Sequence, residues 1–453
     1  MSMPRPSTLE HLATELAAGR TSAVQLAEAA LARARDPAGE GARVFTHVSA
    51  ERALAAARAS DLLRSAGIVR SPLEGLPVSV KDLFDVAGEV TTAGSAVLRD
   101  AASAARNAPV IDRLIAAGAV IVGRTNMSEF AFSGLGLNPH YGTPANPWDR
   151  ATRRIPGGSS SGAAVSVSDG MAAIAIGSDT GGSVRIPSAL CGLTGFKPTQ
   201  RRVPTGGAVP LSTSLDSVGP LGPSVRCCAI TDAVLAGEPV PTPSTRALTG
   251  TRLAVPETVV LDGMDAAVAA AFERALARLS AAGAHITRLA VPEFAEFANL
   301  HARGTLAAAE SWAWHRQLLA KREAEYDPRV SSRIRNGDKM GAADYIDLVA
   351  GRHRWIAQVE ARIADFDALA LPTVPVVAPS IAELEASDAA YFAANGLILR
   401  NPTLINFLDG CALSLPCHRR GEAPVGLMLA GAGGRDADIL ALGEAVERAL
   451  AEV

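Results

Sequence analysis

Serines that follow paired glycines occur at two places in the sequence. The first is Gly157-Gly-Ser-Ser-Ser-Gly162, and the second is Gly177-Ser-Asp-Thr-Gly-Gly-Ser-Val-Arg-Ile-Pro187. Glycines permit tight turns, and such a turn can direct successive backbone N–H groups into one concavity that stabilises an oxyanion. Because the second segment follows a predicted strand, Ser183 is predicted to be a nucleophile at the edge of such an anion hole. The hole would be formed by the N–H groups of Thr180, Gly181, Gly182 and Ser183.

A nucleophilic serine needs a base, and the sequence offers an unusual lysine for this role. Of its 43 lysine and arginine residues only four are lysines, and one of them, Lys81, ends an apolar run. Arginine does not deprotonate in proteins, whereas a buried lysine can lose its proton and then accept another. Lys81 is therefore a candidate base. The alternative is that Lys81 forms a structural ion pair with Asp82 or Asp85.

Other interpretations of the glycine-rich segments are weaker. A GxSxG match at 158–162 would make Ser160 the nucleophile of a histidine-based hydrolase. No clear strand precedes it, however, and His140 comes before this serine in the chain. The phosphate-loop pattern is absent, and the glycines at 431–434 do not have the spacing of a dinucleotide site. An ordinary surface loop stays the alternative for either segment.

Short apolar runs that alternate with helical patterns must position these groups. Leu9, Leu12 and Leu16 have helical spacing after a capping-box sequence at Ser7, and Thr21 can cap a second helix. Strands are predicted at 76–80, 119–122, 172–176, 252–255, 285–289, 368–371, 412–415 and 425–429. Helices are predicted at 110–117, 162–168, 266–279, 293–321, 342–363 and 436–451. Alternation in both halves predicts an α/β fold around one large sheet.

Length and composition limit the organisation and the partners. The chain has 453 residues, is 48% hydrophobic and has a net charge of −3, which fits a globular protein with a large core. Charge runs that would predict a nucleic-acid partner are absent, and no apolar stretch approaches the roughly 18 residues of a membrane helix. The five cysteines have no metal-ligand spacing, so we expect no metal, no cofactor and a reduced, cytoplasmic setting. The Pro- and Ser-rich stretch 238–245 is predicted to connect two halves.

Several separated motifs, in order, closely resemble those of the amidase signature family. Gly75-Leu-Pro-Val-Ser-Val-Lys-Asp82 precedes the two glycine-serine segments, and Ser159 and Ser183 are 24 residues apart, as in that family. Asn126-Met-Ser-Glu-Phe130 and Cys191-Gly-Leu-Thr-Gly-Phe-Lys-Pro198 match as well. The resemblance covers about residues 5–450. It implies one domain over 1–453 with a single large mixed β-sheet covered by helices on both faces. Its parts would be an N-terminal helical segment at 1–65, a signature-bearing half at 66–237 and a second half at 246–453.

The resemblance also implies a role for each residue of a Ser-Ser-Lys triad. Ser183 would be the nucleophile, Ser159 the bridging serine in a turn with a cis peptide bond, and Lys81 the terminal base. Around the triad, Gly158 would relieve crowding in that turn, and Ser160 would be a turn and packing residue or make a hydrogen bond. Asp179 and Arg185 would brace the nucleophile, each paired, since an unpaired buried charge is costly.

The implied reaction is hydrolysis of a carboxylic amide to an acid and ammonia or an amine through an acyl-enzyme. Two alternatives stay open: a glutaminase-type subunit of a tRNA amidotransferase, and an inactive scaffold. The only expected partners are a small-molecule amide and, as an open alternative, a second copy of the chain in a homodimer. Without an arginine pair dedicated to a carboxylate, neutral amides are favoured. Candidate pocket residues are Phe132, Leu135, Trp312, Trp314 and Tyr326.

Overall fold

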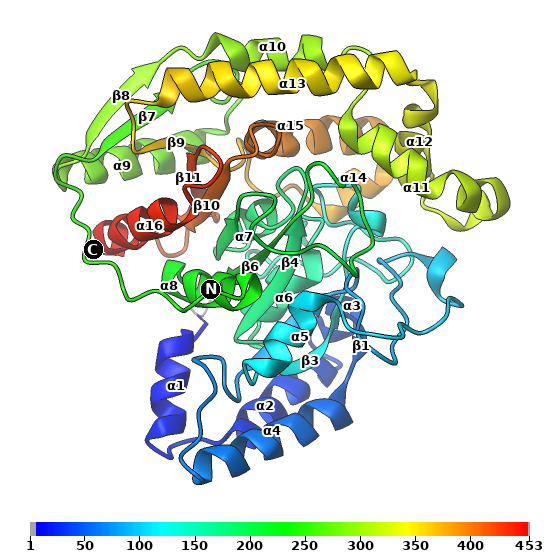
Figure 1. The fold of residues 1–453 in the computed structure, drawn as a ribbon, viewed down its shortest axis with the longest axis vertical. Helices are drawn as coiled ribbons and strands as arrows, with labels where there is room; N and C mark the ends of the chain where they lie inside the picture. The colour runs from blue at the N-terminus through cyan, green and yellow to red at the C-terminus, as the bar shows by residue number, and fades with distance from the viewer. Residues whose placement is uncertain (1–5, 452–453) are drawn as a thin grey trace.

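Eleven strands form one sheet in the computed structural model, which describes residues 6–451 (Figure 1). Their order is β1-β3-β2-β4-β6-β5-β10-β11-β9-β7-β8. β2 is parallel to β3 and β4, and β7 is parallel to β8 and β9, whereas the other neighbours are antiparallel, so the sheet is mixed as expected. The strands are β1 (Phe45–Val48), β2 (Pro77–Lys81), β3 (Val120–Thr125), β4 (Ile174–Asp179), β5 (Thr194–Lys197), β6 (Ser217–Gly222), β7 (Arg252–Pro256), β8 (His285–Leu289), β9 (Ala368–Pro372), β10 (Cys411–Pro416) and β11 (Gly426–Gly431).

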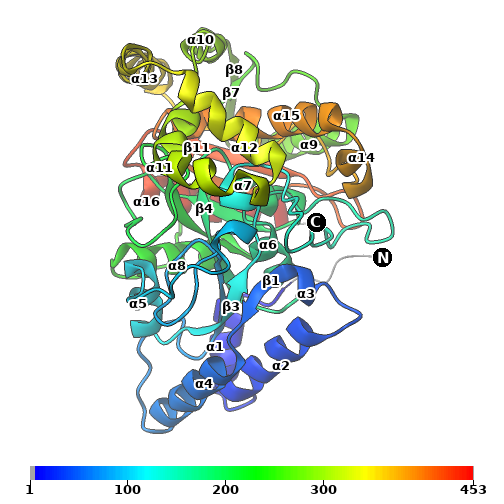
Figure 2. The same ribbon diagram turned by 90° about the vertical axis from the view of Figure 1, so that its right-hand side faces the viewer.

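Helices cover both faces of this sheet (Figures 1 and 2). α1, α5, α8, α9 and α16 pack on one face, and α2, α4, α6, α10, α13 and α15 pack on the other. The helices are α1 (Leu9–Ala17), α2 (Ala23–Arg35), α3 (Gly41–Val44), α4 (Ala50–Ser65), α5 (Pro109–Ala116), α6 (Ser161–Ser168), α7 (Arg185–Leu190), α8 (Val225–Ala236), α9 (Ala266–Ala281), α10 (Pro292–Leu300), α11 (Leu306–Arg322), α12 (Pro328–Arg335), α13 (Ala342–Ile363), α14 (Ile381–Ala386), α15 (Asp388–Phe407) and α16 (Asp436–Ala451). Short 3-10 turns lie at Ala96–Leu98, Glu129–Ala131, Glu323–Glu325 and Asn336–Lys339.

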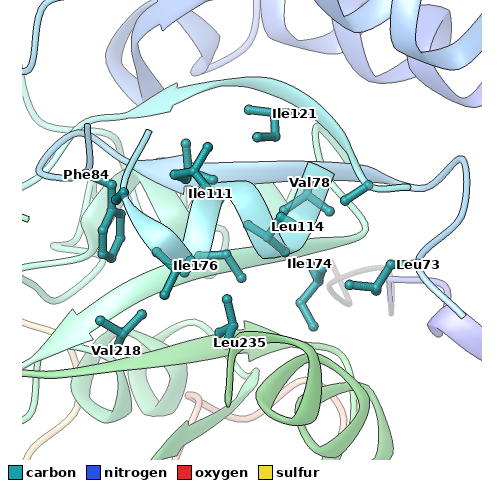
Figure 3. Close-up of a cluster of buried hydrophobic side chains, with 14 of the residues drawn as sticks. Leu73, Val78, Phe84, Ile111, Leu114, Ile121, Ile174, Ile176, Val218 and Leu235 are labelled. Atoms are coloured by element: carbon teal, nitrogen blue, oxygen red, sulfur yellow. The ribbon is translucent and has the colours of Figure 1, made fainter. Parts of the chain in front are cut away.

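The strands near the glycine-serine segments are buried on both sides because each face has its own helices. Ile174 and Ile176 of β4 pack with Ile111 and Leu114 of α5 in one core cluster (Figure 3). Ala175, which lies between these isoleucines, belongs to a second cluster together with residues of α6. Alternate residues of a strand point to opposite faces, so a continuous apolar run is what a doubly covered strand requires.

Two predicted details of the helices are wrong. The helix predicted at 293–321 is two helices, α10 and α11, because Gly304 adopts φ +144° and the Thr305 side chain caps α11. The first two helices begin one residue later than predicted, since Thr8 and Ser22, rather than Ser7 and Thr21, accept the capping hydrogen bonds.

The eight predicted strands are all present, but β1, β5 and β6 were not predicted. β6 contains Gly219 and Pro220, which are unusual in a central strand. A Cβ on Gly219 would lie 2.0 Å from the carbonyl oxygen of Phe196 in β5, so close strand approach requires this glycine.

The sheet continues from the first half of the chain into the second because β5 pairs with β10. The stretch 238–245, predicted to connect the halves, contains no helix or strand and is largely exposed. Within residues 6–451, every helix is too short or too polar to span a bilayer.

Candidate functional site

Lys81 and Ser178 come together because they lie at the ends of neighbouring parallel strands. β2 ends at Lys81, and the register places Val80 beside Ile176 of β4. Lys81 Nζ lies 2.8 Å from Ser178 Oγ, at hydrogen-bond distance. The edge at the carboxyl ends of parallel strands is a common place for binding sites in α/β proteins.

Ser159 contacts the same lysine from a separate turn. Lys81 Nζ and Ser159 Oγ are 2.7 Å apart, and both side chains are fully buried. The peptide bond between Gly158 and Ser159 is cis. A Cβ on Gly158 would lie 2.5 Å from the backbone nitrogen of Gly136, so this turn has no room for a side chain before the serine.

The loop at 128–136 holds this turn in place. The Ser159 carbonyl accepts a hydrogen bond from the Ser128 N–H at 3.0 Å, and the Gly158 N–H donates to the Gly134 carbonyl at 2.8 Å. Backbone hydrogen bonds at both of its residues therefore fix the position of Ser159 relative to β2.

The surroundings of Lys81 favour its neutral form. Burial lowers the pKa of Lys81 to about 7, and the Asp179 and Asp216 carboxylates only partly offset this effect. The ion pairs that could have explained this lysine are absent from residues 6–451, since Asp82 instead pairs with Arg124 at 2.7 Å and Asp85 accepts a hydrogen bond from Thr91. Lys81 can therefore accept a proton near neutral pH.

Ser183 lies in the turn between β4 and α7 and is 3% exposed. Its carbonyl accepts a hydrogen bond from the Ser160 N–H at 3.3 Å, so the two glycine-serine turns contact each other. Ser160 is fully buried, and its hydroxyl donates to the Ser178 carbonyl at 3.4 Å. The structure thus brings Ser183, Ser159 and Lys81 into one site. Ser160, in the first turn, contacts the second turn through its backbone N–H.

The backbone N–H groups around Ser183 are used unequally. The Gly182 N–H donates to Asp179 Oδ1 at 2.8 Å. In the described part of the chain, the N–H groups of Thr180, Gly181 and Ser183 donate no hydrogen bond to a protein group. Of the four groups expected to stabilise an oxyanion, three are therefore free, and that of Gly182 is engaged by the carboxylate.

Asp179 and Arg185 form a fully buried ion pair, with Arg185 Nη2 2.9 Å from Asp179 Oδ1. Asn406 of α15 lies against both side chains: its Nδ2 donates to Asp179 Oδ1 at 2.9 Å, and its Oδ1 accepts from Arg185 Nη2 at 2.5 Å. Burial acts to raise the pKa of Asp179, but the Arg185 guanidinium, the Lys197 charge and the Asn406 hydrogen bond together outweigh burial, so the pKa lies well below its usual range. Both charges are thus paired, as expected.

Three residues of the site could not be identified from local sequence pattern. Ser178 was inside a motif but had no assigned contact with Lys81, and Asn406 is 227 residues from Asp179 along the chain. Asp216 accepts a hydrogen bond from Thr180 Oγ1 at 2.5 Å, and burial raises its pKa to about 6. The signal that could have found Ser178 is its place directly before Asp179, two residues beyond the strand predicted at 172–176.

The candidate pocket residues divide into two groups. Tyr326 is buried, Phe132 and Trp312 are half-buried, and all three belong to one cluster around Phe130. The Tyr326 hydroxyl is 2.9 Å from His315 Nδ1. Leu135 is fully buried in a different cluster, with Ile186. Trp314 is 39% exposed and contacts Phe130.

Within residues 6–451, no group of three or more His, Cys, Asp or Glu side chains is arranged to hold a metal ion. All five cysteines are free thiols. The groups that the structure gathers at the site are serine hydroxyls, one lysine and backbone N–H groups.

Similarity to known proteins identifies the family of this chain. A family model described as Amidase matches residues 25–440. The chain belongs to the amidase signature family. Amidase signature enzymes are hydrolases that act on C–N bonds with a serine, serine and lysine, which are the residue types gathered here.

Relatives within the amidase signature family differ in their substrates. The chain is 39% identical to a 2-amino-5-chloromuconic acid deaminase from Comamonas testosteroni, over 87% of this chain and 86% of the relative. It is 37% identical to a glutamyl-tRNA(Gln) amidotransferase subunit from Chloroflexus aggregans, over 96% of this chain and 94% of the relative. A crystal structure of an amidase superposes with a TM-score of 0.87 at 32% identity, covering 98% of this chain and 99% of the other. The family and the fold are therefore shown, whereas the substrate differs from one relative to the next.

Proposed function

We propose that this protein is a stand-alone amidase in which Ser183 attacks the amide carbonyl, Ser159 relays the proton and Lys81 is the terminal base. The observation that carries the proposal is the 2.7 Å contact between Lys81 Nζ and Ser159 Oγ in a fully buried setting. A lysine with a pKa of about 7 is partly neutral at physiological pH, so its lone pair can accept a proton from the Ser159 hydroxyl.

The reaction proceeds in two halves. In the first, Ser183 Oγ forms a bond to the carbonyl carbon while its proton passes to Ser159, whose own proton passes to Lys81. The tetrahedral intermediate then collapses, the C–N bond breaks, and the proton returns through Ser159 to the leaving nitrogen. In the second half, water attacks the acyl-enzyme through the same relay, which releases the acid and restores the Ser183 hydroxyl.

The negative charge on the carbonyl oxygen is stabilised by the free N–H groups of Thr180, Gly181 and Ser183. One such donor typically lowers the barrier by about 3 kcal/mol. Asp179 acts indirectly: it accepts hydrogen bonds from the N–H groups of Gly182, Val184 and Arg185, which fixes the backbone of the turn. This arrangement positions the donors before substrate binds.

The test is the replacement of Ser183 by alanine. We expect Ser183→Ala to lower kcat for simple amides more than about 1,000-fold, because loss of a serine nucleophile removes the covalent route. A fluorophosphonate probe should label the wild-type protein and fail to label the variant, while the melting temperature stays the same. If the variant keeps more than a few per cent of wild-type kcat, the nucleophile is another residue. A wild-type chain that neither labels nor hydrolyses amides would favour the inactive scaffold.

A second candidate is a glutaminase-type subunit, favoured by the 37% identity to a glutamyl-tRNA(Gln) amidotransferase subunit. The two functions differ in what the isolated chain does. A stand-alone amidase hydrolyses simple amides without a partner, whereas the glutaminase type is expected to act on glutamine. Purified chain should therefore be assayed with glutamine and with a graded series of aliphatic and aryl amides. Turnover confined to glutamine would contradict the proposal.

A further inference from the structure

Arg333 on α12 is a half-buried arginine without a carboxylate within 4 Å in the described part of the chain. Its Nε and Nη2 atoms are buried, and neither has a hydrogen-bond acceptor in the described part of the chain. Buried guanidinium nitrogens of Arg64, Arg124 and Arg226 also lack hydrogen bonds. Arg124 and Arg226, however, lie within 4 Å of a carboxylate, and Arg64 Nη2 donates to the Glu74 carbonyl at 3.1 Å. Arg333 has no carboxylate that close within residues 6–451, and burial lowers its pKa although the Tyr391 side chain, its hydrogen-bond partner, and the Asp327 carboxylate act to raise it.

The other two arginines of α12 show that the helix does not lack acidic partners. Arg329 pairs with Asp388 at 2.7 Å, and Arg335 pairs with Glu323. Asp327, the remaining acid close to Arg333, caps α12 by accepting a hydrogen bond from the Arg329 N–H. Burying guanidinium nitrogens without an acceptor or a counter-charge is costly, and a ligand that supplies the missing charge reduces this cost.

Arg333 lies over a residue of the loop that supports the Gly158-Ser159 turn. Its guanidinium carbon is 4.7 Å from the centre of the Phe132 ring. Two residues further along this loop, the Gly134 carbonyl accepts the hydrogen bond from Gly158, next to Ser159. The Arg333 guanidinium and the turn that holds Ser159 therefore both contact the loop at 128–136.

We propose that Arg333 binds a carboxylate of the substrate, so that the preferred amides carry a carboxylate on the acyl chain, as monoamides of dicarboxylic acids do. A guanidinium offers a planar pair of N–H donors that matches the two oxygens of a carboxylate. The guanidinium carbon lies 4.7 Å from the Phe132 ring centre, and Nε and Nη2 stay without an acceptor. The sequence favoured neutral amides because no arginine pair was visible, but the guanidinium of one arginine suffices for one carboxylate. This inference rests on the proposed amidase activity.

The first experiment compares charged and uncharged substrates of similar length. Malonamate, succinamate and glutaramate would be assayed against butyramide and valeramide, in wild type, Arg333→Gln, Arg333→Lys and Arg335→Gln. For the best carboxylated amide we expect wild-type kcat/KM to exceed that of its uncharged counterpart about 100-fold. Arg333→Gln should lose this preference, mainly through KM, and Arg333→Lys should keep part of it because a point charge remains. Arg335→Gln removes a charge from the same helix on its exposed side and should keep the full preference.

A second measurement separates the carboxylate site from the amidase activity. Succinate or glutarate at millimolar concentration should raise the melting temperature of Ser183→Ala, and addition of Arg333→Gln, or of Arg333→Lys if the glutamine variant is unstable, should reduce that shift. Turnover of uncharged amides with no preference for carboxylates and no shift would overturn the inference and keep the amidase. If the chain hydrolyses no amide but the melting temperature still rises with succinate or glutarate in an Arg333-dependent way, the carboxylate site stands and the amidase proposal fails.

Discussion

Lys81 is a buried amine whose hydrogen-bond partners are two serine hydroxyls, and this setting makes its protonation state the control on activity. Burial lowers its pKa to about 7, and only the neutral amine has a lone pair for the proton of Ser159. The Ser178 hydroxyl at 2.8 Å can accept one of the two N–H bonds of the neutral amine. The lone pair is then directed toward Ser159, which is the direction that the relay requires.

The first prediction concerns the pH dependence and the identity of this base. We expect kcat/KM to fall about tenfold for each pH unit below about 7 and to reach a plateau above it, because protonation removes the base. Lys81→Arg keeps the charge but cannot deprotonate, so it should lose more than about 100-fold, almost as much as Lys81→Ala. The measurement is kcat/KM against pH for the three proteins. An arginine variant within about tenfold of wild type, a loss of only about 1.4 kcal/mol, would exclude the lysine-base mechanism.

Ser178→Ala is predicted to lower kcat about five- to tenfold without changing the fold. The variant removes one neutral hydrogen bond, worth about 1 kcal/mol, from the group that orients the Lys81 amine. Ser168→Ala is a matched control, since Ser168 is a buried serine of α6 whose hydroxyl has no partner within residues 6–451. Steady-state kinetics on one amide test this, and equal rates for the two variants would show that Ser178 does not orient the base.

The residues that could be predicted from sequence differ from those that could not in how far apart their partners are. Gly158 and Gly182 lie in the chain beside the serines proposed to be catalytic, so a local pattern could identify them. Asn406 contacts Asp179 from 227 residues away, and Arg333 is distinguished by two buried nitrogens without an acceptor and by the absence of a carboxylate within 4 Å among the described residues. A single sequence contains no local signal for either fact.

The turn between β4 and α7 is held against α15 by the Asp179–Arg185 ion pair and its hydrogen bonds with Asn406. Arg185→Met leaves the Asp179 carboxylate buried with fewer partners, and we expect the free energy of unfolding to fall by about 3–5 kcal/mol. Arg288→Met, which removes an exposed arginine paired with Glu273, should change it by less than about 1 kcal/mol. Urea unfolding gives both values. A loss for Arg185→Met as small as that of the surface control would mean that Asp179 is stabilised without its arginine.

Among the secondary-structure elements, those with strong internal patterns could be predicted. All eight predicted strands are apolar runs that are buried by helices, except β8, which lies at the edge of the sheet. β6 could not be predicted because glycine and proline are unusual in a strand. Only the close approach of β5, at Phe196, explains why Gly219 is required there. The break between α10 and α11 could not be predicted either, because a single glycine is compatible with a helix, whereas the positive φ of Gly304 ends the helical pattern.

The whole molecule is organised around contacts that cross between the two halves of the chain. Phe196 and Val225 from the first half share a core cluster with Leu253 and Leu413 from the second. The pairing of β5 with β10 and the Asn406 brace add polar contacts across the same boundary. Each half would therefore expose part of this core and an unpaired strand edge if it were separated from the other.

From these contacts we predict that the chain unfolds as one cooperative unit. Neither half can bury its side of the shared cluster alone, so loss of one half should destabilise the other by exposing apolar surface. Urea unfolding followed by circular dichroism and by fluorophosphonate labelling of Ser183 should give one midpoint. A protease site inserted in the exposed stretch 238–245 provides a stricter test, because no strand pairing is cut there. The two fragments should stay associated and active after cleavage. Two separate transitions, or fragments that dissociate in native buffer, would show that the halves are independent domains.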